Sequence, residues 1–224
     1  MSSRTIYVNL FRSRGIKLAI SYFFQCHLFD LLNRTDTHKM LRKDEMEVDS
    51  GNFVHSLMYM VSWTSTIKRT QIFLKGIIEN QSKQYTFIDV GCGKGKVVLL
   101  ARKLGIIGCD RASYIGIDFE PNLLTIARKN STKMFGDQGT FLNCDALEFD
   151  YSIYSTSLIF FMYNPFDKPL IENFLSHVSQ HNPILVYVNP VNRDSLLDYG
   201  FKSMVRREGW HPNLSFEVFK LPDK

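Results

Sequence analysis

Three carboxylates follow short apolar runs in the middle of the chain. Asp89 interrupts the end of the run that begins at Phe87, Asp118 ends a second run, and Asp145 follows a third. Runs of this length with β-branched residues are typical of buried strands, and the carboxyl ends of parallel strands meet at one edge of a sheet. A carboxylate at the tip of the second strand can accept hydrogen bonds from the vicinal hydroxyls of a ribose. The spacing therefore predicts a shared binding crevice at this edge.

A glycine turn follows the first carboxylate, with Gly91, Gly93 and Gly95 at alternate positions. Glycine permits positive φ and lets a ligand lie against bare backbone. A turn that binds a dinucleotide has glycine at its first, third and sixth positions, and the sixth position here is Lys96. The turn therefore favours a ligand with no phosphate to bind. A nicotinamide-dependent oxidoreductase remains an alternative, because a carboxylate at the Asp118 position can bind the ribose of a dinucleotide as well as that of a nucleoside without a diphosphate.

The order of these motifs resembles the class I, Rossmann-like methyltransferases that depend on S-adenosylmethionine, over about Tyr59 to Leu221. The resemblance implies that the first acidic residue and the glycine turn hold the methionine end of the cofactor, the second acid its ribose and the third its adenine. It also implies that Tyr59 and the turn at residues 62–64 close over the methionine end. The implied cofactor-binding residues are Asp89, Gly91, Cys92, Gly93, Gly95, Asp118, Phe119, Asp145, Ala146 and Tyr59.

A fourth apolar run, Leu158 to Tyr163, leads into Asn164-Pro165-Phe166. This element resembles the Asn-Pro-Pro-Tyr motif of methyltransferases that act on planar nitrogens. The resemblance implies that Asn164 and the Pro165 carbonyl accept the N–H bonds of the acceptor while Phe166 stacks on it. Methyl transfer from a sulfonium is an in-line displacement, so the protein mainly provides proximity and alignment, worth ~7–11 kcal/mol. The single proline and the Phe in place of Tyr favour a protein side chain or a small molecule over DNA.

Composition excludes several classes of protein. The apolar fraction of 45% is that of a globular chain, and the net charge of +5 is not gathered into a continuous basic stripe, which disfavours nucleic-acid binding. The longest apolar stretch, Ile16 to Leu32, is too interrupted by polar residues to span a bilayer. The cysteines have no metal-ligand spacing and no secretory signal opens the chain, so we expect reduced thiols, a cytoplasmic protein and no metal.

These elements predict an α/β fold with a doubly wound, mostly parallel seven-stranded sheet. A hairpin from Phe201–Arg207 and Leu214–Leu221 should close the sheet antiparallel, which argues against the sixth parallel strand of a dehydrogenase. We expect residues 1–52 to form an amino-terminal helical extension and linker, and residues 53–224 to form the methyltransferase domain. A non-catalytic module that binds the same cofactor is the second alternative.

Two amino-terminal helices are expected. Gly15 to Leu32 is amphipathic and suits a lid or a helix packed at the domain edge; a membrane-surface role is less favoured, because its polar face is not strongly basic. Arg34 to Gly51 is polar and predicts a linker or flap. The helix over Ile67 to Ile78 should turn inward the apolar residues Ile67, Ile72, Phe73, Ile77 and Ile78.

Overall fold

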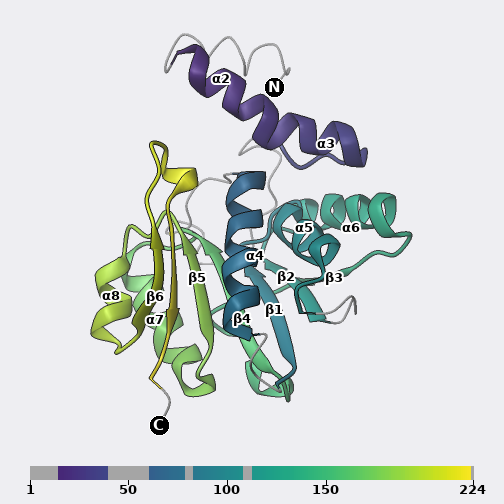
Figure 1. Cartoon of the computed structure of the whole chain (residues 1–224). Coiled ribbons are helices and arrows are strands. Elements are labelled where there is room, and N and C mark those ends of the chain that lie inside the picture. Colours follow the sequence, from purple (N-terminus) through teal and green to yellow (C-terminus); the bar gives the residue numbers. More distant parts are fainter. Residues whose placement is uncertain (1–14, 40–60, 79–82, 108–112, 223–224) are drawn as a thin grey trace.

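The computed structural model describes residues 15–39, 61–78, 83–107 and 113–222. Within these ranges the chain forms one seven-stranded sheet in the order β3-β2-β1-β4-β5-β7-β6, with helices on both faces (Figure 1). A further helical element lies above the carboxyl ends of the parallel strands. No helix in the described part of the chain is long and apolar enough to cross a membrane.

Strands β1 to β5 pair with one another in parallel, and β7 pairs antiparallel with both β5 and β6. This topology confirms the predicted doubly wound sheet and its carboxyl-terminal hairpin. The strands are β1 (Tyr85–Val90), β2 (Tyr114–Asp118), β3 (Thr140–Asn143), β4 (Ser157–Tyr163), β5 (Ile184–Val188), β6 (Lys202–Arg207) and β7 (Phe216–Lys220).

Each face of the sheet is buried under its own layer of helices. Phe87 in β1 belongs to the core beneath α4, α5 and α6, whereas the next residue, Ile88, belongs to the core beneath α7 and α8. Burial on both faces explains why the parallel strands are apolar throughout. The helices are α4 (Thr64–Ile78), α5 (Lys96–Leu104), α6 (Pro121–Phe135), α7 (Lys168–Val178) and α8 (Arg193–Asp198).

One predicted inward position of α4 is wrong. Ile72 is 66% exposed, whereas Ile67, Leu74 and Ile78 are buried. The buried positions, together with Gln71, follow at intervals of three and four residues, so they share one face of the helix and Ile72 lies off it.

The amino-terminal element is a continuous run of α2 (Ile16–Tyr22), a five-residue π-helical stretch η1 (Phe23–His27) and α3 (Leu28–Asn33). It packs on the rest of the chain through a small core that includes Leu18, Cys26 and Trp63. The predicted helix is thereby confirmed. The proposed domain boundary after residue 52 lies outside the described residues.

Residues 34–38, predicted to begin a linker or flap, are instead tied to the end of α3 by Asp30. The Asp30 carboxylate accepts from Thr35 Oγ1, Thr37 N–H and Oγ1, His38 N–H and His38 Nδ1. Burial by itself would raise the pKa of Asp30, but these hydrogen bonds hold it well below its usual range. The first part of the predicted flap is therefore an ordered turn.

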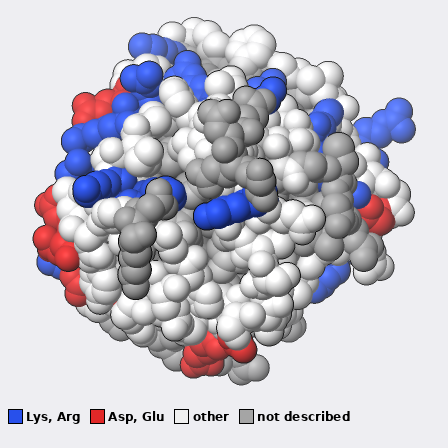
Figure 2. All heavy atoms as spheres, turned by 60° about the horizontal axis from the view of Figure 1, so that its bottom comes forward, with Lys and Arg blue, Asp and Glu red and all other residues white. Residues whose placement is uncertain are grey.

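Charged side chains are dispersed over the face shown in Figure 2. Lys and Arg lie among uncharged residues there, with Asp and Glu toward the rim.

Candidate active site

The glycine turn is fastened to the tip of β2 by three hydrogen bonds that its backbone N–H groups donate. The N–H groups of Gly91 and Cys92 both donate to Ile117 O over 2.9 Å, and Gly93 N–H donates to Asp118 Oδ2 over 2.7 Å. Gly91 has φ of 73°, a conformation that glycine adopts without strain. The turn and the second carboxylate therefore form one unit.

Cys92, predicted as a cofactor contact, packs inside this unit. A Cβ at Gly116 would lie 2.7 Å from Cys92 Sγ, so the thiol fills the space over that glycine in β2. Burial raises the pKa of the Cys92 thiol well above its usual range. The Cys92 side chain is thus a packing group, and only its backbone belongs to the turn.

Asp118 is buried at the end of β2 with both carboxylate oxygens engaged. Besides Gly93, Glu120 N–H donates to Oδ1 over 3.0 Å. Burial raises the pKa of Asp118 to about 6, although the two backbone N–H groups oppose that shift. Each oxygen has a second lone pair, so this carboxylate can still accept from ligand hydroxyls.

Asp89 lies deeper than the other two acids. It is 3% exposed, its strand neighbours are Gly116 and Phe161, and it faces the α5 side of the sheet. Burial, and secondly the Asp118 charge, raise the pKa of Asp89 well above its usual range. This carboxyl would ionise more readily next to a cationic ligand group.

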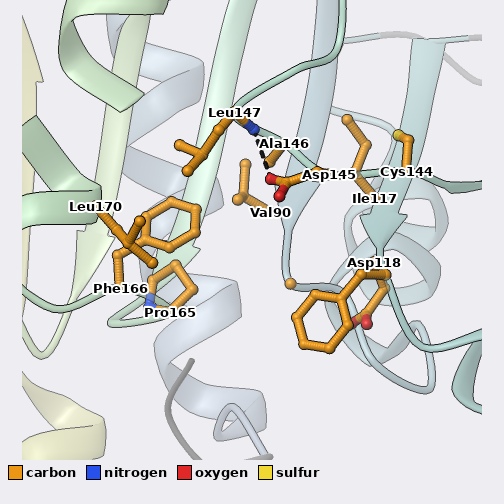
Figure 3. Close-up of a pocket in the computed structure, with 12 residues that line it drawn as sticks. Val90, Ile117, Asp118, Cys144, Asp145, Ala146, Leu147, Pro165, Phe166 and Leu170 are labelled. Carbon is orange, nitrogen blue, oxygen red and sulfur yellow. Dashed lines mark hydrogen bonds between the residues drawn. The ribbon is translucent and has the colours of Figure 1, made fainter. Parts of the chain in front are cut away.

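A pocket opens beside the strand tips and brings most of the predicted site residues together (Figure 3). It contains about 440 Å³ of empty space, part of it open to solvent. Phe166, Pro165 and Leu170 lie on one side of it and Ile117, Cys144 and Asp118 on the other. Its lining residues are Val90, Gly91, Ile117, Asp118, Phe119, Cys144, Asp145, Ala146, Leu147, Pro165, Phe166 and Leu170.

Asp145 is held at the pocket by a local turn. Its Oδ1 accepts from Leu147 N–H over 2.9 Å, drawn as the dashed line in Figure 3. The hydroxyl of Tyr151 donates to Ala146 O over 2.9 Å and fixes the next residue as well. The third acidic motif is therefore rigid where it borders the pocket.

The Asn164-Pro165-Phe166 element divides between the pocket and the interior. Pro165 and Phe166 line the pocket, but Asn164 is buried behind it with φ of 41°. Asn164 Oδ1 accepts from Tyr187 Oη over 2.9 Å, and Asn192 Nδ2 donates to Phe166 O over 3.2 Å. Sequence reasoning missed Tyr187 and Asn192, since Tyr187 lies inside an apolar run that is typical of core.

Other predicted residues lie elsewhere. Tyr59 is outside the described residues, and Asp89, Cys92, Gly93 and Gly95 do not line the pocket. The turn at residues 62–64, expected near the methionine end, contacts the amino-terminal element: Thr64 Oγ1 donates to Gln25 O over 2.6 Å.

Two buried lysines next to the glycine turn also bind that element. Lys96 Nζ donates to Gln25 O over 2.6 Å, and Lys94 Nζ lies 3.4 Å from Asp36 Oδ2. Lys96, which the sequence indicated only as a departure from the dinucleotide pattern, thus fastens the turn to the helix above it.

The residues that line the pocket suit an adenosine group and do not suit a diphosphate. Its apolar walls suit a flat base, and its two carboxylates could accept from ribose hydroxyls and an exocyclic amine. None of its lining residues is Lys or Arg. A sulfonium nucleoside therefore suits this chemistry, and an acidic dinucleotide does not.

Comparison with known proteins agrees with this geometry. A family model described as a methyltransferase domain matches residues 81–197. Ribosomal protein L11 methyltransferase from Burkholderia thailandensis is 30% identical over 89 residues, which are 39% of this chain and 28% of that protein. The chain thus spans little more than a quarter of that relative's length.

Two solved structures share the fold. Magnesium protoporphyrin IX methyltransferase from Synechocystis PCC 6803, with bound S-adenosylmethionine, has a TM-score of 0.51 at 15% identity and covers 98% of this chain and 96% of its own. An RNA methyltransferase from Salinibacter ruber with S-adenosylhomocysteine has a TM-score of 0.50 at 18% identity and covers 74% and 95%. These proteins act on different acceptors, so the shared fold by itself favours no acceptor class.

Proposed function

The chain belongs to the methyltransferase domain family of S-adenosylmethionine-dependent enzymes, and we propose that it methylates a nitrogen on a protein side chain or a small molecule. The observation that carries the proposal is a pocket at the strand tips that is shared by cofactor and acceptor motifs. Gly91, Asp118 and Asp145 line it together with Pro165 and Phe166. Cofactor and acceptor groups would therefore meet in one cavity, which is what an in-line transfer requires.

The cofactor half of the proposal assigns one part of S-adenosylmethionine to each acid. Asp118 accepts from the ribose hydroxyls, Asp145 and the Ala146 backbone bind the adenine edge, and Phe119 packs on the base. Asp89 and the glycine turn hold the methionine end. S-adenosylmethionine brings the activated methyl group, so the residues of the chain mainly orient it and keep water away.

In the part of the proposal that concerns the methyl acceptor, the Asn164-Pro165-Phe166 element aligns the acceptor with the methyl group. The Pro165 carbonyl accepts from the acceptor N–H, and Phe166 stacks on the acceptor, which is supported by its place in the pocket lining. Asn164 Oδ1 accepts from Tyr187 behind the pocket, so Asn164 supports the turn that presents Pro165 and Phe166. Tyr187 is then a positioning residue, since it acts through Asn164.

The acceptor class is proposed from the character of the site. The pocket is mostly apolar and no cationic side chain lines it, which suits a small or side-chain acceptor better than a phosphate backbone. Cys26, Cys92 and Cys144 are free thiols, which supports the proposed cytoplasmic location.

Two measurements test the proposal. Fluorescence titration with S-adenosylhomocysteine and NADH should give binding of the first alone, and Asp118→Ala should weaken it. Methyl transfer from labelled S-adenosylmethionine to fractionated lysate, read separately as protein, nucleic acid and small molecules, should label protein or small molecules. Label in nucleic acid alone would refute the acceptor class, and binding without any transfer would favour a non-catalytic module.

A further inference from the structure

The outer face of the amino-terminal element is an exposed apolar stripe. Ile16, Ile20, Phe24, Leu31 and Leu32 are 62%, 51%, 57%, 65% and 73% exposed. Monomeric proteins rarely expose contiguous apolar patches of this kind unless the patch binds a partner or a membrane. We call these five residues the outer stripe.

The stripe is continuous because of the π-helical turn. Ile16, Ile20 and Phe24 follow at intervals of four residues, which share a helix face. The next apolar pair comes after η1, whose wider turn changes the phase of the helix and keeps Leu31 and Leu32 exposed. On the opposite side, Leu18, Cys26 and Phe29 are buried against the rest of the chain. The element thus has one face that holds it in place and a second apolar face outward.

The exposed charges in this element and in the turn that follows it are positive. Lys17 of the element and Arg34 and Lys39 of the turn are exposed, whereas Asp30 is buried among hydrogen-bond donors and Asp36 faces Lys94. An apolar face bordered by cations is complementary to an anionic bilayer surface.

An exposed tryptophan adjoins one end of the stripe. Trp210 is 52% exposed, and Lys17 Nζ lies 4.4 Å from the centroid of its ring. Tryptophan next to lysine is typical of protein surfaces that lie at the level of lipid headgroups.

We propose that the outer stripe binds the surface of a membrane that contains anionic lipids. The element then lies in the plane of the headgroups with the carboxyl ends of the strands beneath it (Figure 1). The sequence-based expectation disfavoured a membrane-surface role on the charge of the polar face; the exposed apolar stripe among the described residues is the observation that changes it. The inference is independent of the proposed acceptor.

Flotation of the full-length protein with phosphatidylcholine vesicles, with and without phosphatidylglycerol, tests the proposal. The anionic vesicles should carry the protein and neutral ones much less, with binding that weakens as salt rises. Ile20→Ser with Leu31→Ser should lower binding about tenfold or more, since two apolar side chains no longer enter the interface. The matched control is Ile72→Ser with Ile153→Ser, two isoleucines 66% and 64% exposed on other elements.

Absence of flotation with anionic vesicles, or equal loss in both variant pairs, would overturn the proposal. Sedimentation of the parent as a dimer that only the Ile20/Leu31 pair disrupts would also overturn it, because a second copy would then cover the stripe. Both pairs should keep the parent's affinity for S-adenosylhomocysteine. That control shows that the variants are folded and keeps the result separate from the test of methyl transfer.

Discussion

The hydroxyl of Tyr187 in β5 donates to the side-chain oxygen of Asn164 at the end of β4, over 2.9 Å. The two strands are neighbours in the sheet, so the bond links the acceptor element to the rigid centre of the fold. Asn164 has φ of 41° and precedes a proline. A residue before proline prefers an extended backbone, so this left-handed conformation is unfavourable. The bond from Tyr187 therefore helps to fix an otherwise unfavourable turn.

Tyr187→Phe should lower turnover several-fold while leaving the affinity for S-adenosylhomocysteine unchanged. The substitution leaves Asn164 Oδ1 without its buried donor, at a cost of about 1–3 kcal/mol, and lets the turn at Pro165 relax. Steady-state kinetics with the identified acceptor and calorimetric titration of the cofactor product check the two parts. Asn164→Ala should likewise lower turnover, whereas Asp118→Ala should chiefly weaken cofactor binding. Weaker cofactor binding in Asn164→Ala and lower turnover alone in Asp118→Ala would contradict the assigned roles.

Gly91→Ala should impair both folding and cofactor binding. The residue has φ of 73°, and a Cβ there would lie 3.4 Å from Pro165 Cβ at the pocket wall. The conformational cost is about 1 kcal/mol. Gly136→Ala is the matched control, because Gly136 has φ of 77° with nothing within 4 Å of the added Cβ.

The two glycine variants should lose similar thermal stability, since both carry the same backbone strain. Only Gly91→Ala should weaken the binding of S-adenosylhomocysteine in titration. Equal cofactor affinity in the two variants would mean that the turn is not at the cofactor.

Cofactor affinity should fall as the pH is lowered through the titration of Asp118. The pKa of Asp118 is raised to about 6 in the folded chain, and ribose hydroxyls donate best to the ionised form. Binding of S-adenosylhomocysteine should therefore weaken by up to about tenfold per pH unit below that value. Asp118→Asn should show weaker binding with a flatter pH profile.

The same shift has the opposite sign for the stability of the ligand-free protein. Because the folded pKa lies above the ordinary value of 3.8, the contribution of Asp118 is present below that value and is lost as the pH rises through about 6. A thermal-melt series with and without cofactor product should reveal this opposition. A parallel pH trend in the two series would contradict it.

Asp89 should release its proton when the cofactor binds. Burial and the Asp118 charge raise the pKa of Asp89, and the cationic amino group of the methionine end would stabilise the ionised form. Calorimetric titration in buffers of different ionisation enthalpy, repeated over a series of pH values, should detect release of up to about one proton. Asp89→Asn should abolish that release, and a buffer-independent enthalpy for the parent would refute the proposed contact.

Much of the fold follows from sequence because local and tertiary signals agree. The run from Tyr114 to Asp118 is a strand with those bounds, and the Asp118 and Asp145 motifs do reach one pocket. The parallel strand ends meet at one edge of the sheet, so spacing along the chain translates directly into proximity.

The details that sequence did not provide depend on contacts between distant segments. Tyr187 lies in an apolar run that is typical of a buried strand. Its hydrogen bond to Asn164 could be predicted only if the register of β4 and β5 were known. The exposure of Ile72 and of the outer stripe was not predicted for a related reason. An apolar residue on a helix indicates a face to be covered, but only tertiary packing determines which of two apolar faces is covered.

Asp30→Ala should release the turn over residues 34–38 and loosen the amino-terminal element. The Asp30 carboxylate accepts five hydrogen bonds there, and its removal takes that acceptor from His38 and from two backbone N–H groups, at a cost of about 3 kcal/mol or more. Because the hydrogen bonds hold the pKa of Asp30 below its usual range, this contribution is present at neutral pH and is lost only as the pH falls below about 4. Hydrogen exchange at neutral pH should show faster exchange over residues 28–38, with β1 still protected. Asp150→Ala is the control, because Asp150 also accepts from local donors but is exposed. Unchanged exchange over residues 28–38 in Asp30→Ala would refute the role of the carboxylate.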